Sequence, residues 1–331
     1  MNKKKSACII GLGYYLPEKI LTNQDLEKIV DTSDEWITTR TGIKERRIAA
    51  ENEATSDLGY NAAKSALEAA NVNPEEVELI IVATITPDMF FPATSCLIQQ
   101  KLGAKNAAAF DMSAACTGYI YALSVGKQFI ENGTYKKVLV IASDTMSRIT
   151  NWEDRNTCVL FGDGAGAALL SAEDSDCGIL STYLAADGTH SDLLFMLGCG
   201  SRHPADQDVI DKKMQFLQMS GNEVFKLAVG SMLKSSENAL NLAGLGKDDV
   251  SLVIPHQANL RIINAIAKRL KIGSERLYIN IEKYGNMSGA TVAVALAEAA
   301  EQDRLKKGDI ICLTAFGAGL TSGAGVIKWG K

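Results

Sequence analysis

The sequence predicts an α/β protein made of two similar halves, with two helices buried at its centre. Three observations predict this. Short runs rich in Val and Ile alternate with Ala-rich helical segments, four segments recur in the same order in both halves, and two helical segments carry no charge. Alternation of this kind is typical of buried sheets whose faces are covered by helices.

The composition is that of an ordinary globular protein. The 331 residues are 47% hydrophobic and 22% charged, which suits one large domain or two of about 150 residues. The formal net charge of −5 gives no basic footprint for nucleic acid. No run of about 18 apolar residues is present, so we expect no membrane span.

The seven cysteines are scattered singly, without the CxxC pair of zinc or redox sites. We therefore expect no metal, no disulfide framework and a reducing, cytoplasmic compartment. The N-terminal stretch "MNKKKSACIIGLGYYLP" has a basic start, but glycine and proline interrupt its short apolar run. It is interpreted as a first strand and not as a signal peptide.

The internal similarity indicates a tandem duplication. "SALEAANVNPEEVELII" (65–81) aligns with "NALNLAGLGKDDVSLVI" (238–254), because each has an Ala/Leu helix, a turn of small residues, two acids and a Val-led strand. A repeated order of segments is the mark of duplicated architecture. Three more pairs follow in the same order: "DMSAACTGYIYAL" with "NMSGATVAVAL", "KKVLVIAS" with "KKGDIICLTA", and "GAGAALL" with "GAGVIKW".

The duplication predicts two halves, 1–175 and 176–331, which pack face to face around a pseudo-twofold axis. The charge-free segments 116–126 and 290–297 then lie at the centre, since a helix with no polar face must be buried on every face. Cys116 stands where the first central helix begins, directly after the strand "AAAFDMS".

A thiol at the start of a helix is a candidate nucleophile. The thiolate is the reactive form, and a helix N-terminus lowers the pKa of a cysteine through its free N–H groups and partial positive charge. The small neighbours of Cys116 would let a substrate carbonyl approach. The alternative is that Cys116 is only a small buried apolar residue.

His256 and Asn286 are the candidate partners of this thiol. His256 ends the strand "VSLVIP", and the carboxyl ends of strands are where α/β sites are usually built. Asn286 in "KYGNMSGAT" stands at the mouth of the second central helix, where its amide can donate to an oxyanion or enolate. A hydrogen-bonded core histidine and a helix-capping asparagine are the alternatives.

Three glycine-rich stretches carry weaker signals. "GLGYYLP" lacks the third glycine of the dinucleotide fingerprint, and "FGDGAGA" (161–167) lacks the spacing and the Lys-Ser/Thr pair of a P-loop. "FGAGLTSGAG" (316–325) follows an apolar strand, so its backbone N–H groups can complete an oxyanion hole. Tight turns for sheet packing are the alternative for all three.

Across nearly its whole length the sequence resembles the β-ketoacyl-acyl-carrier-protein synthase III family, the condensing enzymes that start type II fatty-acid synthesis. Six stretches carry the resemblance, in the order of the family: "TSDEWITTRTGIKERRIA" (32–49), "DMSAACTGYIYAL", "FGDGAGAA", "GNEVFKLAV" (221–229), "PHQANLRII" (255–263) and "YGNMSGAT".

The resemblance implies the thiolase fold, a five-layer α/β/α/β/α sandwich, and a Cys-His-Asn triad carried onto Cys116, His256 and Asn286. Cys116 would take an acetyl or short or branched acyl group from acyl-CoA. Malonyl-ACP would then lose CO₂ while His256, as a neutral donor, and Asn286 hold the thioester oxygen. The oxyanion of the acyl-enzyme would be held by the backbone N–H groups of Cys116 and Ala318. No cofactor is implied, because both acyl compounds are substrates.

The resemblance also implies binding residues. Trp36 and Arg155 would flank the CoA adenine, Arg40 would meet a CoA phosphate, and Phe91 would reach into the partner's acyl pocket in a homodimer. Gly221, Phe225, Ala258 and Asn259 would line a pantetheine tunnel. A basic patch for the acidic carrier protein would consist of Lys226, Arg261, Lys268 and Arg269; for the last three, a solvated helix face is the alternative.

The sequence departs from the family at a few positions. Met287, Gly289 and Ala290 stand where Thr, Ala and Ala are more frequent, and Ser322 stands where a bulky residue can occur. Ala318 replaces the middle glycine of a triple-glycine loop and should serve if its φ is negative. We expect these changes to affect the size of the acyl pocket more than the reaction type.

Three rival functions remain. The nearest is a sister condensing enzyme of the same fold that uses longer or secondary-metabolite acyl chains. Two other classes of this fold are disfavoured by Asn286, because classical thiolases would need a second catalytic cysteine and elongating synthases would need a second histidine. A Cys-His-Asn protease or hydrolase would show a C-G-S-C-W-like context, which "SAACTGY" does not supply. A non-catalytic scaffold is disfavoured because all three reactive residue types are present.

Overall fold

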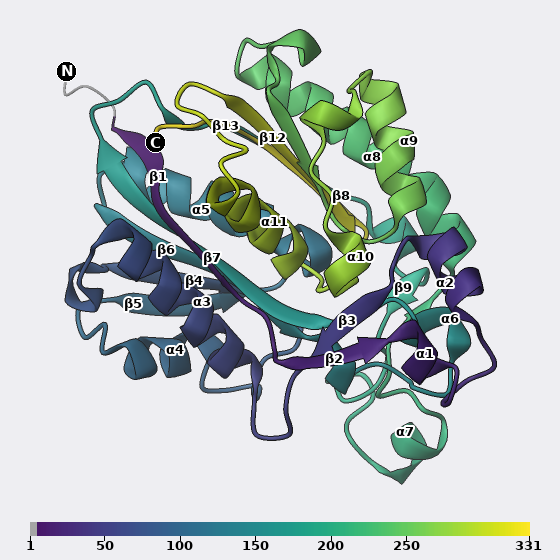
Figure 1. Ribbon diagram of the computed structural model, residues 1–331. Coiled ribbons are helices and arrows are strands. Elements are labelled where there is room, and N and C mark those ends of the chain that lie inside the picture. The colour runs from purple at the N-terminus through teal and green to yellow at the C-terminus, as the bar shows by residue number, and fades with distance from the viewer. Residues whose placement is uncertain (1–4) are drawn as a thin grey trace.

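Two β-sheets with two helices between them form the body of the protein (Figure 1). The computed structural model describes residues 5–331. The first sheet has the strand order β1-β7-β6-β4-β5 and the second β11-β12-β13-β8. The strands are β1 Ser6–Tyr15, β4 Leu79–Ala83, β5 Ala108–Met112, β6 Lys137–Thr145, β7 Asp163–Glu173, β8 Gly178–Ala186, β11 Leu252–Pro255, β12 Ile310–Gly317 and β13 Thr321–Lys328.

The two sheets follow the same plan. In the first, β4 runs parallel to β6, β6 antiparallel to β7, and β7 antiparallel to β1. In the second, β11, β12, β13 and β8 repeat these relations, while β5 has no counterpart. Segments that recur in the sequence therefore occupy equivalent strands. The boundary near residue 175 falls between β7 and β8, and its use as a domain division stays a prediction.

The central layer consists of α5 (Gly118–Glu131) and α11 (Ala290–Glu301), as Figure 1 shows. Every residue of 290–299 is buried, as the charge-free sequence predicted. On α5 the first charge, Lys127, is buried as well and pairs with Glu131 at 2.8 Å. A Cβ at Gly166 of β7 would lie 2.5 Å from Cβ of Ala293, so glycine lets α11 rest directly on the first sheet.

Helices on the outer faces complete a five-layer α/β/α/β/α sandwich, which confirms the predicted fold class. Helices α3 (Thr55–Ala70) and α4 (Thr94–Leu102) cover the first sheet, and α8 (Gly221–Leu242), with α9 (Leu260–Leu270) beside it, covers the second. The remaining elements are β2 Lys19–Thr22, α1 Asn23–Leu26, α2 Asp34–Thr41, β3 Glu45–Ile48, α6 Arg155–Cys158, β9 Leu194–Phe195, α7 Gln207–Asp211, β10 Gln218–Met219 and α10 Ile281–Tyr284.

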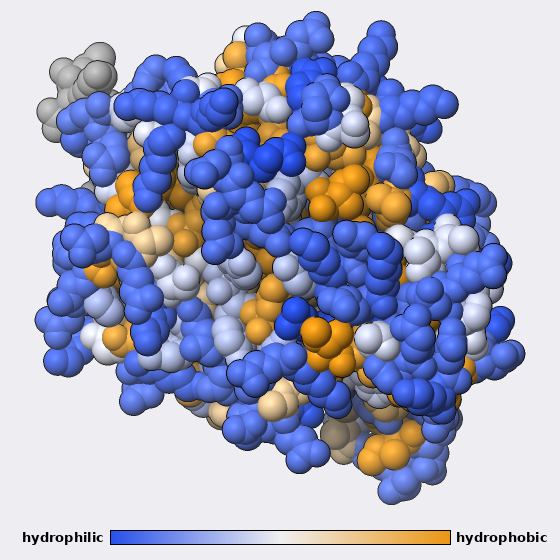
Figure 2. All heavy atoms as spheres, in the orientation of Figure 1, coloured by the Kyte–Doolittle hydropathy of each residue, from blue (hydrophilic) through white to orange (hydrophobic). Residues whose placement is uncertain are grey.

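The face shown in Figure 2 is largely hydrophilic, with small, separate apolar patches. Scattered patches of this size are normal on a folded protein and need no partner. Among residues 5–331, no helix combines the length and the apolar character needed to cross a membrane.

Arg46 of β3 is fully buried and ties the N-terminal segment to the region before β7. Its guanidinium donates to Asn23 Oδ1 at 2.9 Å, to the carbonyl of Leu21 at 3.2 Å and to the carbonyl of Val159 at 2.7 Å. Burial lowers the pKa of Arg46 to about 10, which still leaves the side chain charged at neutral pH.

Replacing Arg46 by methionine is expected to lower the free energy of unfolding by about 2–4 kcal/mol. Methionine keeps much of the apolar stem, but the two buried acceptors on Asn23 and Val159 and the part-buried carbonyl of Leu21 lose their donor, at roughly 1–3 kcal/mol for a buried unsatisfied group. Urea denaturation followed by circular dichroism measures the change. Arg202→Met, at an exposed arginine, is the control. Equal stability of the two variants would contradict this role for Arg46.

Candidate active site

One cavity of about 410 Å³ brings together Cys116, His256 and Asn286. Cys116 lies in a single 3₁₀ turn, Ala115–Thr117, immediately before α5. His256 follows the last residue of β11, and Asn286 lies four residues before the start of α11. The three residues come from different elements and from both halves, and they line the same cavity. Each lies next to the end of an element, as the sequence predicted. Their individual roles stay predictions.

The turn that carries Cys116 is held against the β12–β13 hairpin. Ala115 has a left-handed φ of 46°, which turns the chain sharply before the cysteine. A Cβ on Gly317 would lie 2.7 Å from the backbone nitrogen of Cys116, so only glycine permits this approach. Thr117 Oγ1 donates to Thr321 Oγ1 at 2.7 Å and locks the turn to the hairpin.

The pKa of Cys116 is raised, whereas its position at a helix start predicted a lowered pKa. Burial, with a smaller contribution from the nearby carboxyl group of Asp144, raises the pKa of the thiol to about 12. Ser288 and the cysteine's own backbone N–H act in the other direction but are outweighed; Ser288 Oγ lies beside the thiol without completing a full hydrogen bond. The free thiol is therefore protonated at neutral pH, and desolvation, not the helix start, dominates it.

Alkylation of Cys116 by iodoacetamide should therefore speed up about tenfold per pH unit between pH 7 and 9, without a plateau. Only the thiolate reacts, and below a pKa of about 12 its fraction rises tenfold per unit. Peptide mass spectrometry separates Cys116 from the exposed Cys96, which serves as the internal reference. A rate that levels off near pH 7 would show a lowered pKa and restore the helix-start expectation.

His256 is held as a neutral imidazole beside the central helix α11. Its backbone N–H donates to the carbonyl of Thr314 at 2.8 Å, which extends the β11–β12 pairing by one residue. Its Nδ1 lies 2.6 Å from Thr291 Oγ1. Burial lowers the pKa of His256 to about 3, so the ring carries a single proton at neutral pH.

Asn286 is clamped by its backbone and oriented by its side-chain oxygen. Its N–H donates to the carbonyl of Leu160 at 2.8 Å, and its carbonyl accepts from Gly162 at 3.1 Å, so "FGDGAGA" positions this residue. Its Oδ1 accepts from the N–H of Ser288 at 2.9 Å. Among residues 5–331 the Nδ2 group has no hydrogen-bond partner. Oδ1 of Asn286 caps the turn at Ser288, and the amide N–H₂ of the same side chain is left free to donate to a ligand in the cavity.

The mouth of the cavity contains most of the residues assigned to CoA. Its lining includes Trp36, Arg40, Gly221, Phe225, Ala258 and Asn259. Arg155 does not line it; its Cζ lies 5.0 Å from the centre of the Trp36 ring, and Arg40 Cζ lies 4.4 Å from it. For an aromatic ring to stack between two flat groups, those groups must be about 7 Å apart, which is twice the contact distance of carbon atoms. Adenine can enter between Trp36 and Arg155 only if Arg155 moves.

The four basic residues assigned to the carrier protein lie on α8 and α9. Arg261 lines the cavity and stands 5.7 Å from the centre of the Phe225 ring. Lys268 and Arg269 are exposed in the last turn of α9. Lys226 is exposed, but it is paired with Glu223 on its own helix at 2.7 Å.

Phe91 does not line the cavity of its own chain. It is 84% exposed and its neighbour Phe90 is 83% exposed, in the loop between β4 and α4. Two adjacent phenylalanines in this position are unusual for a surface facing only water.

The positions that depart from the family lie outside the lining of the Cys116 cavity, apart from Ala318. Met287 is fully buried, and its Sδ would lie 2.5 Å from a Cβ at Gly164, so it packs into the first sheet. Ala318 lines the cavity and has no left-handed φ, which is the condition that the predicted oxyanion-hole role sets. Met287, Gly289, Ala290 and Ser322 therefore do not change the size of the acyl pocket by lining this cavity themselves.

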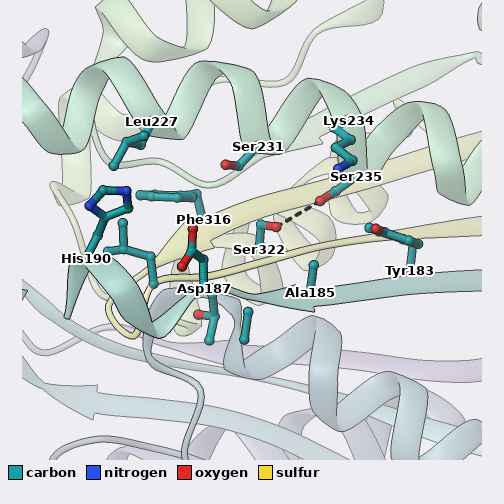
Figure 3. Close-up of a pocket in the computed structure, with 13 residues that line it drawn as sticks. Tyr183, Ala185, Asp187, His190, Leu227, Ser231, Lys234, Ser235, Phe316 and Ser322 are labelled. Atoms are coloured by element: carbon teal, nitrogen blue, oxygen red, sulfur yellow. Dashed lines mark hydrogen bonds between the residues drawn. The ribbon is translucent and has the colours of Figure 1, made fainter.

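Ser322 instead lines a second cavity of about 330 Å³ (Figure 3). Phe316 lines both cavities. Ser235 Oγ donates to Ser322 Oγ at 3.1 Å, and Figure 3 shows His190 at one end of the residues that line the cavity and Tyr183 at the other. This cavity holds no cysteine, so it is separate from the nucleophile.

Two contacts of the site were missed by sequence reasoning. Thr291 touches His256 from within a helix that reads as uniformly apolar, and Asp144, beside Cys116, is the last residue but one of a strand that reads as buried. Burial raises the pKa of Asp144 to about 6, while its Oδ1 accepts three hydrogen bonds, from Thr84, Ile85 and Thr86. A polar residue inside an apolar run is the signal that could have found both.

Comparison with known proteins gives consistent similarities. Two family models match the chain, 3-oxoacyl-[acyl-carrier-protein (ACP)] synthase III over residues 110–188 and the C-terminal model of the same name over residues 240–329. A β-ketoacyl-[acyl-carrier-protein] synthase III of Caldanaerobacter subterraneus subsp. tengcongensis is 57% identical over 331 residues, with 100% of both chains covered. One from Clostridioides difficile is 52% identical, with 99% of both covered. The crystal structure of 3-oxoacyl-[acyl-carrier-protein] synthase III from Aquifex aeolicus VF5 is 51% identical, has a TM-score of 0.90 and covers 98% of this chain and 100% of its own.

Proposed function

The chain belongs to the 3-oxoacyl-[acyl-carrier-protein] synthase III family, and on this premise we propose how its cavity performs the reaction. The protein is a condensing acyltransferase of the step that initiates fatty-acid synthesis. We infer that Cys116 takes an acetyl or short or branched acyl group from acyl-CoA and that malonyl-ACP then condenses with it. The products are 3-oxoacyl-ACP, CoA and CO₂. The convergence of Cys116, His256 and Asn286 on one cavity carries this proposal.

In the first half-reaction, Sγ of Cys116 attacks the thioester carbonyl of acyl-CoA. A C–S bond to Cys116 forms, the C–S bond to CoA breaks, and the thiol proton leaves with the CoA sulfur. The developing oxyanion is held by the backbone N–H groups of Cys116 and Ala318, which such a site uses in place of side chains. The raised pKa of the free thiol implies that the proton is lost only once acyl-CoA is bound.

In the second half-reaction, the thioester oxygen of malonyl-ACP receives hydrogen bonds from His256 and Asn286. Departure of CO₂ leaves the electron pair of the broken C–C bond as an enolate, whose charge these donors stabilise. The carbanion attacks the acyl group on Cys116, and the thiolate leaves and is protonated. A neutral His256 suits this role, because loss of CO₂ generates the carbanion without a strong base.

Acyl-CoA and the carrier protein enter by the same mouth. Trp36, Arg40 and Arg155 would hold the nucleotide end of CoA, with Arg155 displaced from the Trp36 ring by the adenine. The pantetheine arm would follow Gly221, Phe225, Ala258 and Asn259 toward Cys116. The basic residues Lys226, Arg261, Lys268 and Arg269 would attract the acidic carrier protein, as a positive surface attracts a negative partner.

A homodimer accounts for the exposed phenylalanines. Phe90 and Phe91 would be covered by a second copy, with Phe91 of each chain reaching the acyl pocket of the other. We also propose a cytoplasmic location and no cofactor.

The experiment that tests this function offers the purified protein acetyl-, isobutyryl- or octanoyl-CoA together with malonyl-ACP or malonyl-CoA. The expected result is 3-oxoacyl-ACP and CO₂, fastest with a short or branched donor. Fastest acylation by octanoyl-CoA would point to the sister condensing enzymes that use longer chains. Malonyl-CoA serving as well as malonyl-ACP would overturn the carrier-protein assignment.

A further inference from the structure

Thr291, which no part of the reaction above uses, makes the closest polar contact of the catalytic histidine. It lies on the first turn of α11 and is fully buried. Its Oγ1 stands 2.6 Å from Nδ1 of His256, and among residues 5–331 it makes the one hydrogen bond to that ring. His256 lines the cavity shared with Cys116 and Asn286, and Nε2 is the ring nitrogen that the contact with Thr291 leaves free.

We propose that Thr291 is a positioning residue whose hydroxyl donates to Nδ1 of His256 and thereby keeps the ring proton on Nε2, facing the substrate. This inference rests on the proposed function, in which Nε2 donates to the thioester oxygen. A neutral imidazole has one ring proton, and the hydrogen bond made by one nitrogen fixes the proton on the other. Thr291 therefore determines whether Nε2 of His256 presents an N–H donor or a lone pair to the substrate.

One competitor for the hydroxyl proton is present. Thr291 Oγ1 also lies 3.0 Å from the carbonyl oxygen of Ser288, and a hydroxyl has one proton to give. The contact with Nδ1 is shorter, and an imidazole nitrogen is a more basic acceptor than an amide carbonyl. The Ser288 carbonyl also accepts the backbone N–H of Thr291 at 3.3 Å, so it keeps a donor when the hydroxyl turns to His256.

The consequence differs between the two half-reactions. Acyl transfer to Cys116 uses the backbone N–H groups of the oxyanion hole, so it does not depend on the tautomer of His256. Decarboxylation does depend on it, because a lone pair on Nε2 would repel the growing negative charge of the enolate oxygen. Loss of the Thr291 hydroxyl should therefore slow condensation and spare acylation.

The test compares Thr291→Val, which removes the hydroxyl at nearly constant shape, with Thr291→Ser, which keeps it. We expect valine to lower the rate of malonyl-ACP decarboxylation about 10- to 100-fold, as loss of a group that orients a functional histidine typically does. Acyl-enzyme formation should change by less than about threefold, and serine should restore decarboxylation. If the β-branched valine is not accommodated, Thr291→Ala is the second variant.

Nitrogen-15 NMR of the ring gives the readout that a purely structural role would not change. The chain has only three histidines, so the signals of His256 can be assigned with a His256→Gln variant. We expect the proton on Nε2 in the native protein and in Thr291→Ser, and a mixture with Nδ1–H in Thr291→Val. A native protein protonated on Nδ1, or equal decarboxylation by Thr291→Val, would overturn the inference while leaving the proposed function intact. Failure of the native protein to condense at all would instead reject the proposed function.

Discussion

Replacing Cys116 by alanine is expected to abolish the acyl-enzyme and to lower condensation by about 10⁴-fold or more. Among residues 5–331, the chain would lose the only cysteine that lines the cavity with His256 and Asn286. Removal of a nucleophile leaves only binding and oxyanion stabilisation, which is why such losses are large. Intact-protein mass spectrometry after incubation with acyl-CoA measures the adduct directly.

The matched control is Cys96→Ala, which removes an exposed cysteine on α4. It should acylate like the unchanged protein, since its sulfur is remote from the cavity lining. An adduct of full stoichiometry on the Cys116→Ala protein would show that another residue is acylated, and would reject Cys116 as the nucleophile.

Replacing Asn286 by alanine is expected to leave acylation within a few-fold of normal and to slow condensation by about 10²–10³-fold. The amide N–H₂ is free to donate to the enolate oxygen, and loss of one preorganised donor to an oxyanion typically costs this much. The backbone N–H groups that serve acylation are unchanged. The two rates are measured separately, as adduct formation from acyl-CoA and as release of CO₂ from malonyl-ACP.

Asn241→Ala, an exposed asparagine near the end of α8, is the control for this variant. Asn286 Oδ1 also accepts the N–H of Ser288, so a thermal melt must show that the Asn286→Ala protein is folded. Equal losses in acylation and condensation in a folded variant would mean that Asn286 shapes the cavity as a whole and does not act on the enolate.

The fold was predictable because its signals are local and repeated. Strands β4, β6 and β7 and their counterparts β11, β12 and β13 recur in sequence order, and each pair has the same neighbours in its sheet. The burial of α11 also follows from its sequence, because no charged residue interrupts its first two turns. Cys116, His256 and Asn286 could be singled out as candidates because each stands next to the end of such an element.

The pKa of Cys116 could not be predicted from its position at a helix start. Its value depends on how completely other segments exclude water, and these lie far away in sequence, at Gly317 and Ser288. The contact of Arg155 with Trp36 is likewise a matter of packing between two short helices, α6 and α2, that are far apart in sequence. Desolvation and side-chain stacking are set by the tertiary structure, which no local pattern encodes.

Thr291 shows the same limit in another form. A threonine at the start of an apolar helix is read as one more small buried residue, and its partner His256 is 35 residues earlier in the chain. Only the packing of α11 beside the end of β11 reveals that its hydroxyl meets an imidazole nitrogen.

The most direct test of the two-step mechanism is an isotope chase on the acyl-enzyme. The protein is loaded with carbonyl-labelled acetyl-CoA, freed of unbound CoA, and mixed with unlabelled malonyl-ACP. The mechanism predicts that the label leaves the peptide containing Cys116 at the rate at which it appears in the 3-oxo carbon of 3-oxoacyl-ACP. Product that forms while the label stays on the enzyme, or that carries no label, would contradict covalent transfer through Cys116.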